Sequence, residues 1–178
     1  EEVTAFDTGP GNMVMDALTA KLTGGKQTYD EGGRLAAAGR VIPRLLDHML
    51  DDPYLKKQPP KTTGREYFGV DYVASLLAFG DYALVDILAT ATRFTAESIA
   101  LSLERFAPQL PHRLVVGGGG SRNPTLLCFL REALPKVTVQ VQEDLGLDSD
   151  AKEAVAFALL ANEALFGSCN NAPSATGA

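Results

Sequence analysis

The feature that most constrains the fold is a run of four glycines, Gly117 to Gly120, which separates an apolar segment from an amphipathic one. The apolar residues before it, Leu114 to Val116, predict a short buried strand, and the leucines after Pro124 recur at helical spacing. We expect Ser121 to cap that helix, with Pro124 in its first turn, where a missing N–H costs nothing. The sequence thus predicts a strand, a turn and a helix in direct succession.

A glycine-rich turn ahead of a helix lets the backbone approach a flat or phosphorylated ligand without side chains in between. One or two glycines would serve a purely structural corner, and each costs about 0.5–1 kcal/mol relative to alanine. The turn is not a Walker A loop, since no Gly-Lys-Ser/Thr follows, and it does not fit GxGxxG, because no glycine occurs between Gly120 and Gly146. The spacing indicates a ligand of nucleotide size, with a structural turn as the alternative.

Composition narrows the class of protein. The 178 residues suffice for one well-packed domain, and no apolar run approaches the roughly 20 residues of a membrane span. A net charge of −6 argues against a nucleic-acid surface, which requires a basic stripe. The two cysteines, Cys128 and Cys169, form no CxxC motif, and the histidines His48 and His112 are isolated. We therefore expect a cytoplasmic protein with reduced cysteines and no protein-built metal site.

A second turn with functional chemistry follows the segment from Val3 to Phe6, which we expect to be a strand. It reads Asp7-Thr-Gly-Pro-Gly-Asn12 and precedes a helix that starts near Asn12. An acid, a hydroxyl and two glycines at a helix N-terminus suit a phosphate or a metal-bound water. An ordinary capped turn, in which Asp7 or Thr8 accepts hydrogen bonds from backbone donors, is the alternative.

A third candidate lies in the irregular segment from Asp51 to Phe68, where Pro53, Pro59 and Pro60 are expected to stop any helix. Its end, Lys61-Thr-Thr-Gly-Arg-Glu66, places two cations, two hydroxyls and a carboxylate in six residues. Binding residues concentrate on such loops, although a solvated loop with a weak surface ion pair would look the same.

The rest of the chain alternates helices with one more strand, so we expect a single α/β domain with more helix than strand. The last helix should have Asp148 as its N-cap and Gly167 just past its end, and Glu153 in its first turns has a helix-dipole explanation. We expect its apolar residues to be buried: Ala154, Val155, Phe157, Ala158, Ala161 and Leu165. The other expected elements are helices ending at Ala38, over Val41 to Leu50, over Val70 to Phe79 and from Asp81 or Tyr82 to Phe106, and a half-buried or edge strand over Val137 to Val141.

Taken together, these stretches resemble the anhydro-N-acetylmuramic acid kinase family, sugar kinases of the actin-like (ribonuclease H-like) ATPase superfamily. The signatures FDTGPGN and PPKTTGRE are specific, and the resemblance extends over the whole chain. It rests on Phe6 to Asn12, Asp52 to Tyr54, Pro59 to Glu66, Val116 to Gly120 with Asn123, Asp150 with Glu153-Ala154, Ala156 to Ala158, and Thr176 to Ala178.

The resemblance implies a helix-rich α/β fold in which residues 1–178 form a single domain, the C-terminal lobe of a two-lobe sugar kinase. Such kinases use ATP and Mg²⁺ to phosphorylate O6 of 1,6-anhydro-N-acetylmuramic acid while water opens the anhydro bridge, a reaction of amino-sugar metabolism and cell-wall recycling. The partners implied are ATP, the anhydro sugar and the N-terminal lobe of the same protein, with no nucleic acid or membrane; a homodimer is left open. The first phosphate loop and the general-base aspartate are expected in the N-terminal half, so this chain alone should be inactive.

The resemblance also implies roles for individual residues. Glu153 is the catalytic candidate in this chain, and it also belongs with Lys61, Thr63 and Arg65 to the expected sugar-binding set. The residues expected to bind nucleotide are Thr8, Gly9, Gly11, Asn12, Gly117, Gly118, Gly119, Gly120 and Asn123.

Three alternatives remain open. A related kinase acts on levoglucosan and shares the PPKTTGRE form, toward which Thr62-Thr63 leans, whereas the Thr176 to Ala178 tail leans toward the muramic acid branch. The chain could also be a nucleotide-binding module without catalysis, or a purely structural α/β domain. A glycine-rich turn and an aspartate upstream of Glu1 would favour the enzyme.

Overall fold

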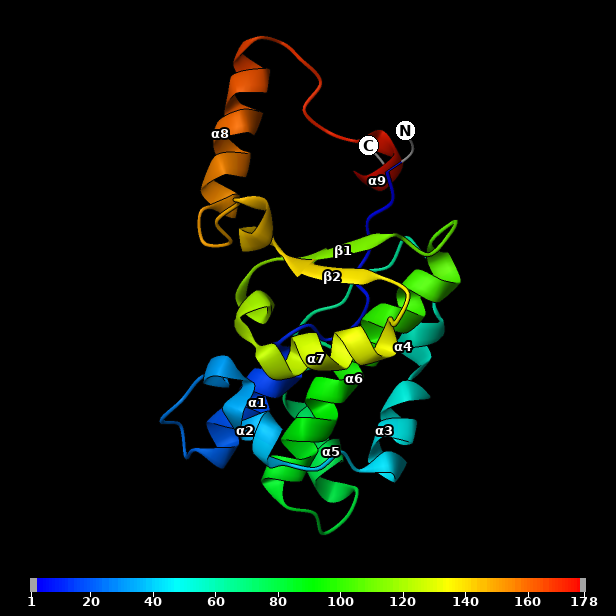
Figure 1. The fold of residues 1–178 in the computed structure, drawn as a ribbon. Helices are drawn as coiled ribbons and strands as arrows, with labels where there is room; N and C mark the ends of the chain where they lie inside the picture. Colours follow the sequence, from blue (N-terminus) through cyan, green and yellow to red (C-terminus); the bar gives the residue numbers. More distant parts are fainter. Residues whose placement is uncertain (1–2, 177–178) are drawn as a thin grey trace.

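The computed structural model describes residues 3–176, which form a helical body with a small sheet on one side (Figure 1). The helices are α1 (Met13–Leu22), α2 (Arg34–Ala38), α3 (Pro43–Leu50), α4 (Pro53–Lys56), α5 (Val70–Ala78), α6 (Leu84–Phe106), α7 (Pro124–Ala133), α8 (Lys152–Leu165) and α9 (Pro173–Thr176). The strands are β1 (Arg113–Val116) and β2 (Thr138–Val141), and short 3₁₀ helices are η1 (Glu31–Gly33), η2 (Gly119–Arg122) and η3 (Gln142–Leu145). This confirms the predicted helix-rich α/β class.

The long helix α6 is the centre of the body, and α1, α2, α3 and α7 pack around it. Its buried side chains include Leu88, Ala91 and Phe94, each completely inaccessible to solvent. Small residues let neighbouring backbone come close: a β-carbon at Gly9 would lie 2.7 Å from Ser98 Oγ, and one at Gly39 would overlap the backbone of Val85. The predicted long buried helix is confirmed, although it begins at Leu84 and not at Asp81 or Tyr82.

The sheet consists of β1 and β2, which run parallel with Arg113 opposite Thr138 and Val116 opposite Val141. Parallel neighbours need a crossover connection, which here contains the glycine turn and α7. One side of the sheet faces α6 and α7 (Figure 1). The prediction that Leu114 to Val116 are buried is only half right, because Val115 on the other side is 39% exposed.

Four local predictions were wrong. Val3 to Phe6 is not a strand, since no described strand lies beside it. Asn123, and not Ser121, caps α7: its Oδ1 accepts a hydrogen bond from Leu126 N–H at 3.0 Å. Asp148 accepts from Asp150 N–H in a turn, and α8 starts after Ala151. Pro53 does not exclude helix; it starts α4, which Asp52 caps.

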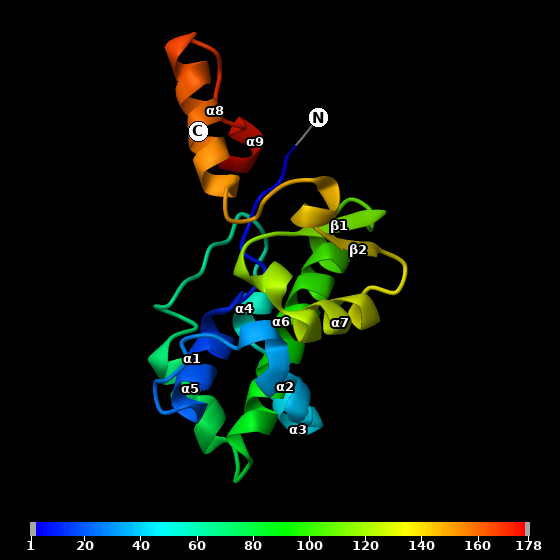
Figure 2. The same cartoon turned by 60° about the vertical axis from the view of Figure 1, so that its left-hand side comes forward.

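Helix α8 departs most clearly from expectation. We predicted that its apolar residues are buried, but none of its side chains is, and Phe157 is 71% exposed. Figures 1 and 2 show α8 standing away from the helical body. No described helix or strand packs extensively along it, so the prediction is wrong for this part of the protein. Gly167, by contrast, follows the helix end as predicted, with φ at 67°.

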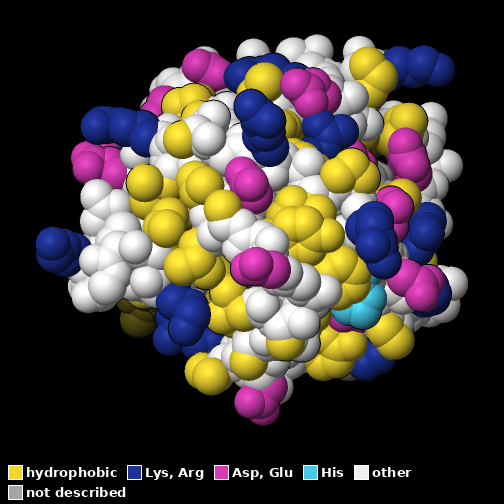
Figure 3. Space-filling model, turned by 90° about the horizontal axis from the view of Figure 1, so that it is seen from below, with side chains coloured by type: hydrophobic (Ala, Val, Ile, Leu, Met, Phe, Trp, Pro, Cys, Tyr) yellow, Lys and Arg dark blue, Asp and Glu magenta, His cyan; other side chains and the backbone are white. Residues whose placement is uncertain are grey.

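One face of the molecule carries charged side chains of both signs. Viewed from below (Figure 3), Lys and Arg side chains are interspersed with Asp and Glu, and no basic stripe crosses that face. None of the helices within residues 3–176 combines the length and apolarity that crossing a membrane requires. The Gly177–Ala178 end of the Thr-Gly-Ala tail lies outside the described residues.

Candidate functional site

A cavity of about 580 Å³ opens where the glycine turn meets the start of α1 and the segment around η1. Its volume is within the range of small-molecule sites. Its lining includes Asn12, Asp16, Tyr29, Arg34, Gly119 and Arg122. The cavity is therefore built by the two turns that the sequence singled out as ligand-binding candidates, together with residues that no motif had indicated.

The four glycines of the turn differ in what a side chain at each position would meet. Gly118 adopts a left-handed φ of 74°, which favours glycine, and a side chain at Gly117 would overlap the amide of Gln142. At Gly119 and Gly120 a β-carbon would face only side chains, with the amide of Asn12 at 3.3 and 3.5 Å. These two glycines therefore leave room in front of Asn12.

Asn12 itself makes no capping bond to α1, so its amide faces the glycine turn and the cavity. Asn123, from the other end of the turn, packs tightly against Gly33, and Thr125 Oγ1 donates to Gly33 O at 2.7 Å. The expected nucleotide-binding residues Asn12, Gly119 and Asn123 thus surround one space.

The two specific signatures are also joined. The Asp7 carboxylate accepts hydrogen bonds from Thr62 Oγ1 at 2.8 Å and from Thr63 N–H at 2.9 Å. Asp7 N–H donates to Lys61 O at 3.1 Å, and Tyr54 Oη donates to Asp7 O at 2.8 Å. The motifs around Asp7, Tyr54 and Thr62 therefore form one hydrogen-bonded unit beside the first turn of α1.

Comparison with known proteins identifies this combination of motifs. The family model of anhydro-N-acetylmuramic acid kinase matches residues 1–178. The chain belongs to the anhydro-N-acetylmuramic acid kinase family. A protein named anhydro-N-acetylmuramic acid kinase from Caldanaerobacter subterraneus subsp. tengcongensis is 48% identical over 185 residues. Proteins of the same name from Bacillus cereus strain AH187 and Bacillus anthracis strain A0248 are each 44% identical. The alignments cover all of this chain but 46–47% of those relatives, so the chain spans about half of their length.

The expected sugar-binding residues of the kinase motif Lys61 to Glu66 do not all point the same way. Lys61 is 8% exposed, and its Nζ lies 4.9 Å from the ring centre of Tyr54 and 4.8 Å from that of Phe106. Burial, together with the nearby Arg105 and Lys57 cations, lowers its pKa. In this part of the protein Lys61 therefore holds the loop against the body through cation–π contacts.

The neighbouring residues of this motif are freer. Thr63 Oγ1 is buried and has no hydrogen-bond partner among the described residues, and Arg65 is exposed. The Arg65 guanidinium is thus open to a ligand, the Thr63 hydroxyl is unpaired but enclosed, and the Lys61 ammonium is both enclosed and engaged.

Asp16 is a cavity residue that sequence reasoning missed. It lies one turn after Asn12 on α1, and burial raises the pKa of its carboxyl to about 6, while the Arg65 cation partly counteracts this. A partly desolvated carboxylate beside a cavity can accept hydrogen bonds from hydroxyl or amino groups. The spacing of four residues from the Asn12 motif was the signal that could have identified it.

Three further residues of the cavity wall lie in the segment around η1. Asp30, though acidic, is occupied: its two carboxylate oxygens accept from Leu35 and Ala36 N–H, both at 2.9 Å. Tyr29 and Arg34 are exposed at the rim and were not predicted either.

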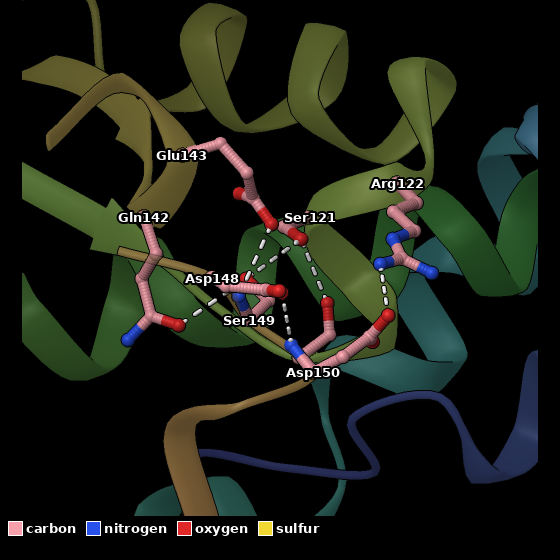
Figure 4. Close-up of polar contacts among 8 residues, drawn as sticks. Ser121, Arg122, Gln142, Glu143, Asp148, Ser149 and Asp150 are labelled. Atoms are coloured by element: carbon pink, nitrogen blue, oxygen red, sulfur yellow. Dashed lines mark hydrogen bonds and ion pairs between the residues drawn. The ribbon is translucent and has the colours of Figure 1, made fainter. Parts of the chain in front are cut away.

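A polar network links the glycine turn to the segment before α8 (Figure 4). Arg122 forms an ion pair with Asp150, and Ser149 Oγ donates to Gln142 Oε1 at 3.2 Å. The hydroxyls of Ser121 and Ser149 lie 3.5 Å apart. Because Arg122 and Asp150 are exposed, their pair contributes little to stability; the network connects the glycine turn to the residues just before α8.

Glu153, the catalytic candidate, lies on the exposed first turn of α8. Within residues 3–176 it makes no hydrogen bond or ion pair, and it does not line the cavity. The structure therefore does not bring Glu153 together with Lys61, Thr63 or Arg65. No group of three His, Cys, Asp or Glu residues among the described ones could hold a metal ion.

Proposed function

We propose that this chain is the nucleotide-binding lobe of an ATP-dependent kinase that phosphorylates O6 of 1,6-anhydro-N-acetylmuramic acid, with hydrolytic opening of the anhydro bridge. The observation that carries the proposal is the cavity in which Asn12 faces the glycine turn, in a chain whose relatives are named for this activity. The proposal includes a cytoplasmic location, as expected from the reduced cysteines. Residues 1–178 would be the C-terminal lobe of an actin-like fold, and the other half would supply the first phosphate loop and the general base.

In this arrangement the adenosine lies against Gly117 to Gly120 and Asn123. The exposed Gly119 and the amide of Asn12 leave space for a flat ring and a ribose. The phosphates then extend toward Thr8, Gly9 and Gly11, where the N-terminus of α1 favours negative charge. Gly9 is also required for packing on Ser98, and Gly11 has a positive φ of 54°.

The sugar would bind beyond the phosphates, where the Asp7 hydrogen bonds hold the loop that carries Thr63 and Arg65. Arg65 is suited to a carboxylate or phosphate because its guanidinium can donate two parallel hydrogen bonds. Glu153 would reach this region only once α8 is held by the rest of the protein.

The described residues do not build a metal site by themselves. Mg²⁺ in kinases is held largely by substrate phosphates and water with one or two carboxylates, so the proposal assigns no metal ligand to this chain. Phosphoryl transfer depends mainly on positioning and electrostatic stabilisation, which here falls to the groups named above.

The proposal is tested with the full-length protein, ATP and two sugars assayed in parallel, 1,6-anhydro-N-acetylmuramic acid and levoglucosan, with mass spectrometry of the products. Formation of N-acetylmuramic acid 6-phosphate from the first sugar supports the proposal. Turnover of levoglucosan alone would identify levoglucosan, and not the muramic acid sugar, as the substrate. Nucleotide binding without turnover of either sugar would indicate a non-catalytic module, and no nucleotide binding would indicate a structural domain.

A further inference from the structure

The composition of α8 is unusual for a helix on a protein surface. Every residue from Ala154 to Ala161 is apolar, and its polar residues are confined to its two ends. At 3.6 residues per turn this run covers about two full turns, so α8 is apolar on all sides and not along one stripe. Helices that are hydrophobic all round are normally buried in a larger protein.

The structure shows no such burial. Val155 and Leu159, four residues apart on one side of the helix, are 54% and 60% exposed, and Phe157 on the opposite side is 71% exposed. Leu165 and Phe166, at the end of α8, are also exposed, by 85% and 79%. Contiguous apolar surface of this kind marks an interaction site on a soluble protein.

We infer that α8 is the docking element for the half of the polypeptide that lies outside these 178 residues, and that it inserts into that half as an enclosed helix. The inference shares one premise with the proposed function, that the chain is part of a longer protein. It does not depend on kinase activity.

Two observations indicate that the other half of the polypeptide covers α8: the length of the relatives and the place where the described chain begins. The relatives are about twice as long as this chain. Ser174 in α9 is hydrogen-bonded to Val3 on both sides, since Val3 N–H donates to its Oγ at 3.1 Å and its Oγ donates to Val3 O at 2.9 Å. Figures 1 and 2 both show this pair at the same end of the molecule as α8. The described chain therefore begins at the same end of the molecule as α8, from which a preceding half can reach this helix.

A second copy of the chain fits the observations less well. A symmetric pair of helices would cover one side of each α8 and leave the remaining apolar sides in water. Asn170 Nδ2 donates to Leu160 O at 3.5 Å, so the segment after α8 already runs back along part of it. Enclosure by a folded lobe covers the sides that remain.

The test measures thiol reactivity in the full-length protein, in a background in which both exposed cysteines are replaced (Cys128→Ser and Cys169→Ser). Phe157→Cys is compared with Val70→Cys, because Val70 is also apolar and 85% exposed but lies on α5 at the opposite end of the molecule. Ala158→Cys provides a second probe of α8 that adds only one atom and removes no apolar contact. The reagent is a small maleimide, applied without nucleotide over a wide range of protein concentrations.

We expect the α8 cysteines to react at least about 100-fold more slowly than Val70→Cys at every protein concentration, since a buried thiol reacts only through local opening. Equal rates would overturn the inference. Protection that disappears on dilution would overturn it as well, because a second copy would then be the occupant. If Phe157→Cys fails to fold, Ala158→Cys alone decides. Protection without kinase activity would leave this inference standing and refute only the proposed function, and activity without protection would do the reverse.

Discussion

The side-chain amide of Asn12 lies directly in front of Gly119, so that a β-carbon at Gly119 would come within 3.3 Å of Nδ2. Two motifs separated by more than half of the chain therefore share one space, and Gly119 is the residue whose missing side chain keeps it open.

We expect Gly119→Val in the full-length protein to weaken ATP binding at least tenfold, about 1.4 kcal/mol, with little change in thermal stability. The added methyl groups meet a movable side chain and the cavity, and no left-handed φ is required at this position. Isothermal titration with ATP and a thermal melt measure the two effects.

Gly118→Ala provides the control. Its φ of 74° makes any side chain strained, so this variant should lose stability by roughly 1 kcal/mol. Binding of ATP to Gly119→Val with unchanged affinity would mean that the glycine turn is only a structural corner.

A second prediction concerns the loop that Asp7 holds. Thr62→Val removes the hydroxyl that donates to Asp7 Oδ2 and keeps the shape of the side chain. Hydrogen bonds to charged groups contribute about 1.5–3 kcal/mol when buried, and less here because Thr62 is exposed. We expect faster amide exchange over residues 61–66 and a several-fold higher KM for the sugar. Thr62→Ser keeps the hydroxyl and should behave as the wild type. Equal effects of both substitutions would show that this hydrogen bond does not order the loop.

The carboxyl of Asp16 gives a pH-dependent prediction. Burial raises its pKa to about 6 from an ordinary value of 3.8, so between these two pH values the folded state binds more protons than the unfolded state. Its contribution to stability is therefore greatest at low pH and is lost as the pH rises to about 6.

Asp16→Asn should remove this loss of stability at higher pH. We expect the variant to be stabilised relative to the wild type by about 1 kcal/mol more at pH 7.5 than at pH 4.5, after allowance for solvent screening of a half-buried group. Urea unfolding at the two pH values measures the difference. An equal effect at both would show that the carboxylate is not desolvated. Asp47→Asn, at a solvent-exposed position on α3, controls for the loss of a negative charge.

Local rules were sufficient to predict the elements whose determinants lie close together in sequence. The proline in the first turn of α7 and the glycine after α8 each act within a few residues, and both were predicted correctly. The meeting of Asn12 with Gly119 was expected only through the family resemblance, because spacing does not say which turns are neighbours in space.

The errors have the same physical origin. Ser121 and Asp148 are good capping residues by type. Asn123, however, accepts the hydrogen bond from the first turn of α7, and Asp148 accepts one from Asp150 N–H in a turn before α8. Residue type alone does not say at which residue the backbone becomes helical. Lys61 was expected to face the sugar, yet three aromatic rings far apart in sequence surround its ammonium group. Burial of α8 could not be judged from this chain, since the surface that would cover it is not part of these 178 residues.

A fourth prediction follows from the chain spanning about half the length of its relatives. The 178-residue chain alone should bind ATP weakly and should not phosphorylate the anhydro sugar, because phosphoryl transfer requires phosphate loops and nucleophile-positioning groups held together. A coupled assay for ADP, with the full-length protein as the positive control, measures this. Sugar-dependent ADP formation by the chain alone would contradict the assignment of half of the catalytic groups to the other lobe.

The last prediction concerns Glu153. Asp148 and Asp150 already place negative charge before α8, so a third carboxylate adds little to the helix-dipole interaction. Glu153 is exposed and without a partner among the described residues, whereas Asp150 is engaged by Arg122. If α8 docks on the other half of the protein, its first turn is carried toward the cleft between the halves, where a carboxylate can accept hydrogen bonds from sugar hydroxyls.

We expect Glu153→Gln in the full-length enzyme to leave folding and ATP affinity unchanged and to lower kcat at least tenfold, about 1.4 kcal/mol of transition-state stabilisation. Asp150→Asn is the matched control: it lies three residues earlier, also removes one negative charge, and breaks only an exposed ion pair, so its kcat should stay within about twofold of the wild type. Steady-state kinetics at saturating ATP compares the two. Equal and small effects at both positions would mean that Glu153 is only a charge at a helix end, and a loss of ATP affinity in Glu153→Gln would place this residue on the nucleotide side of the cleft.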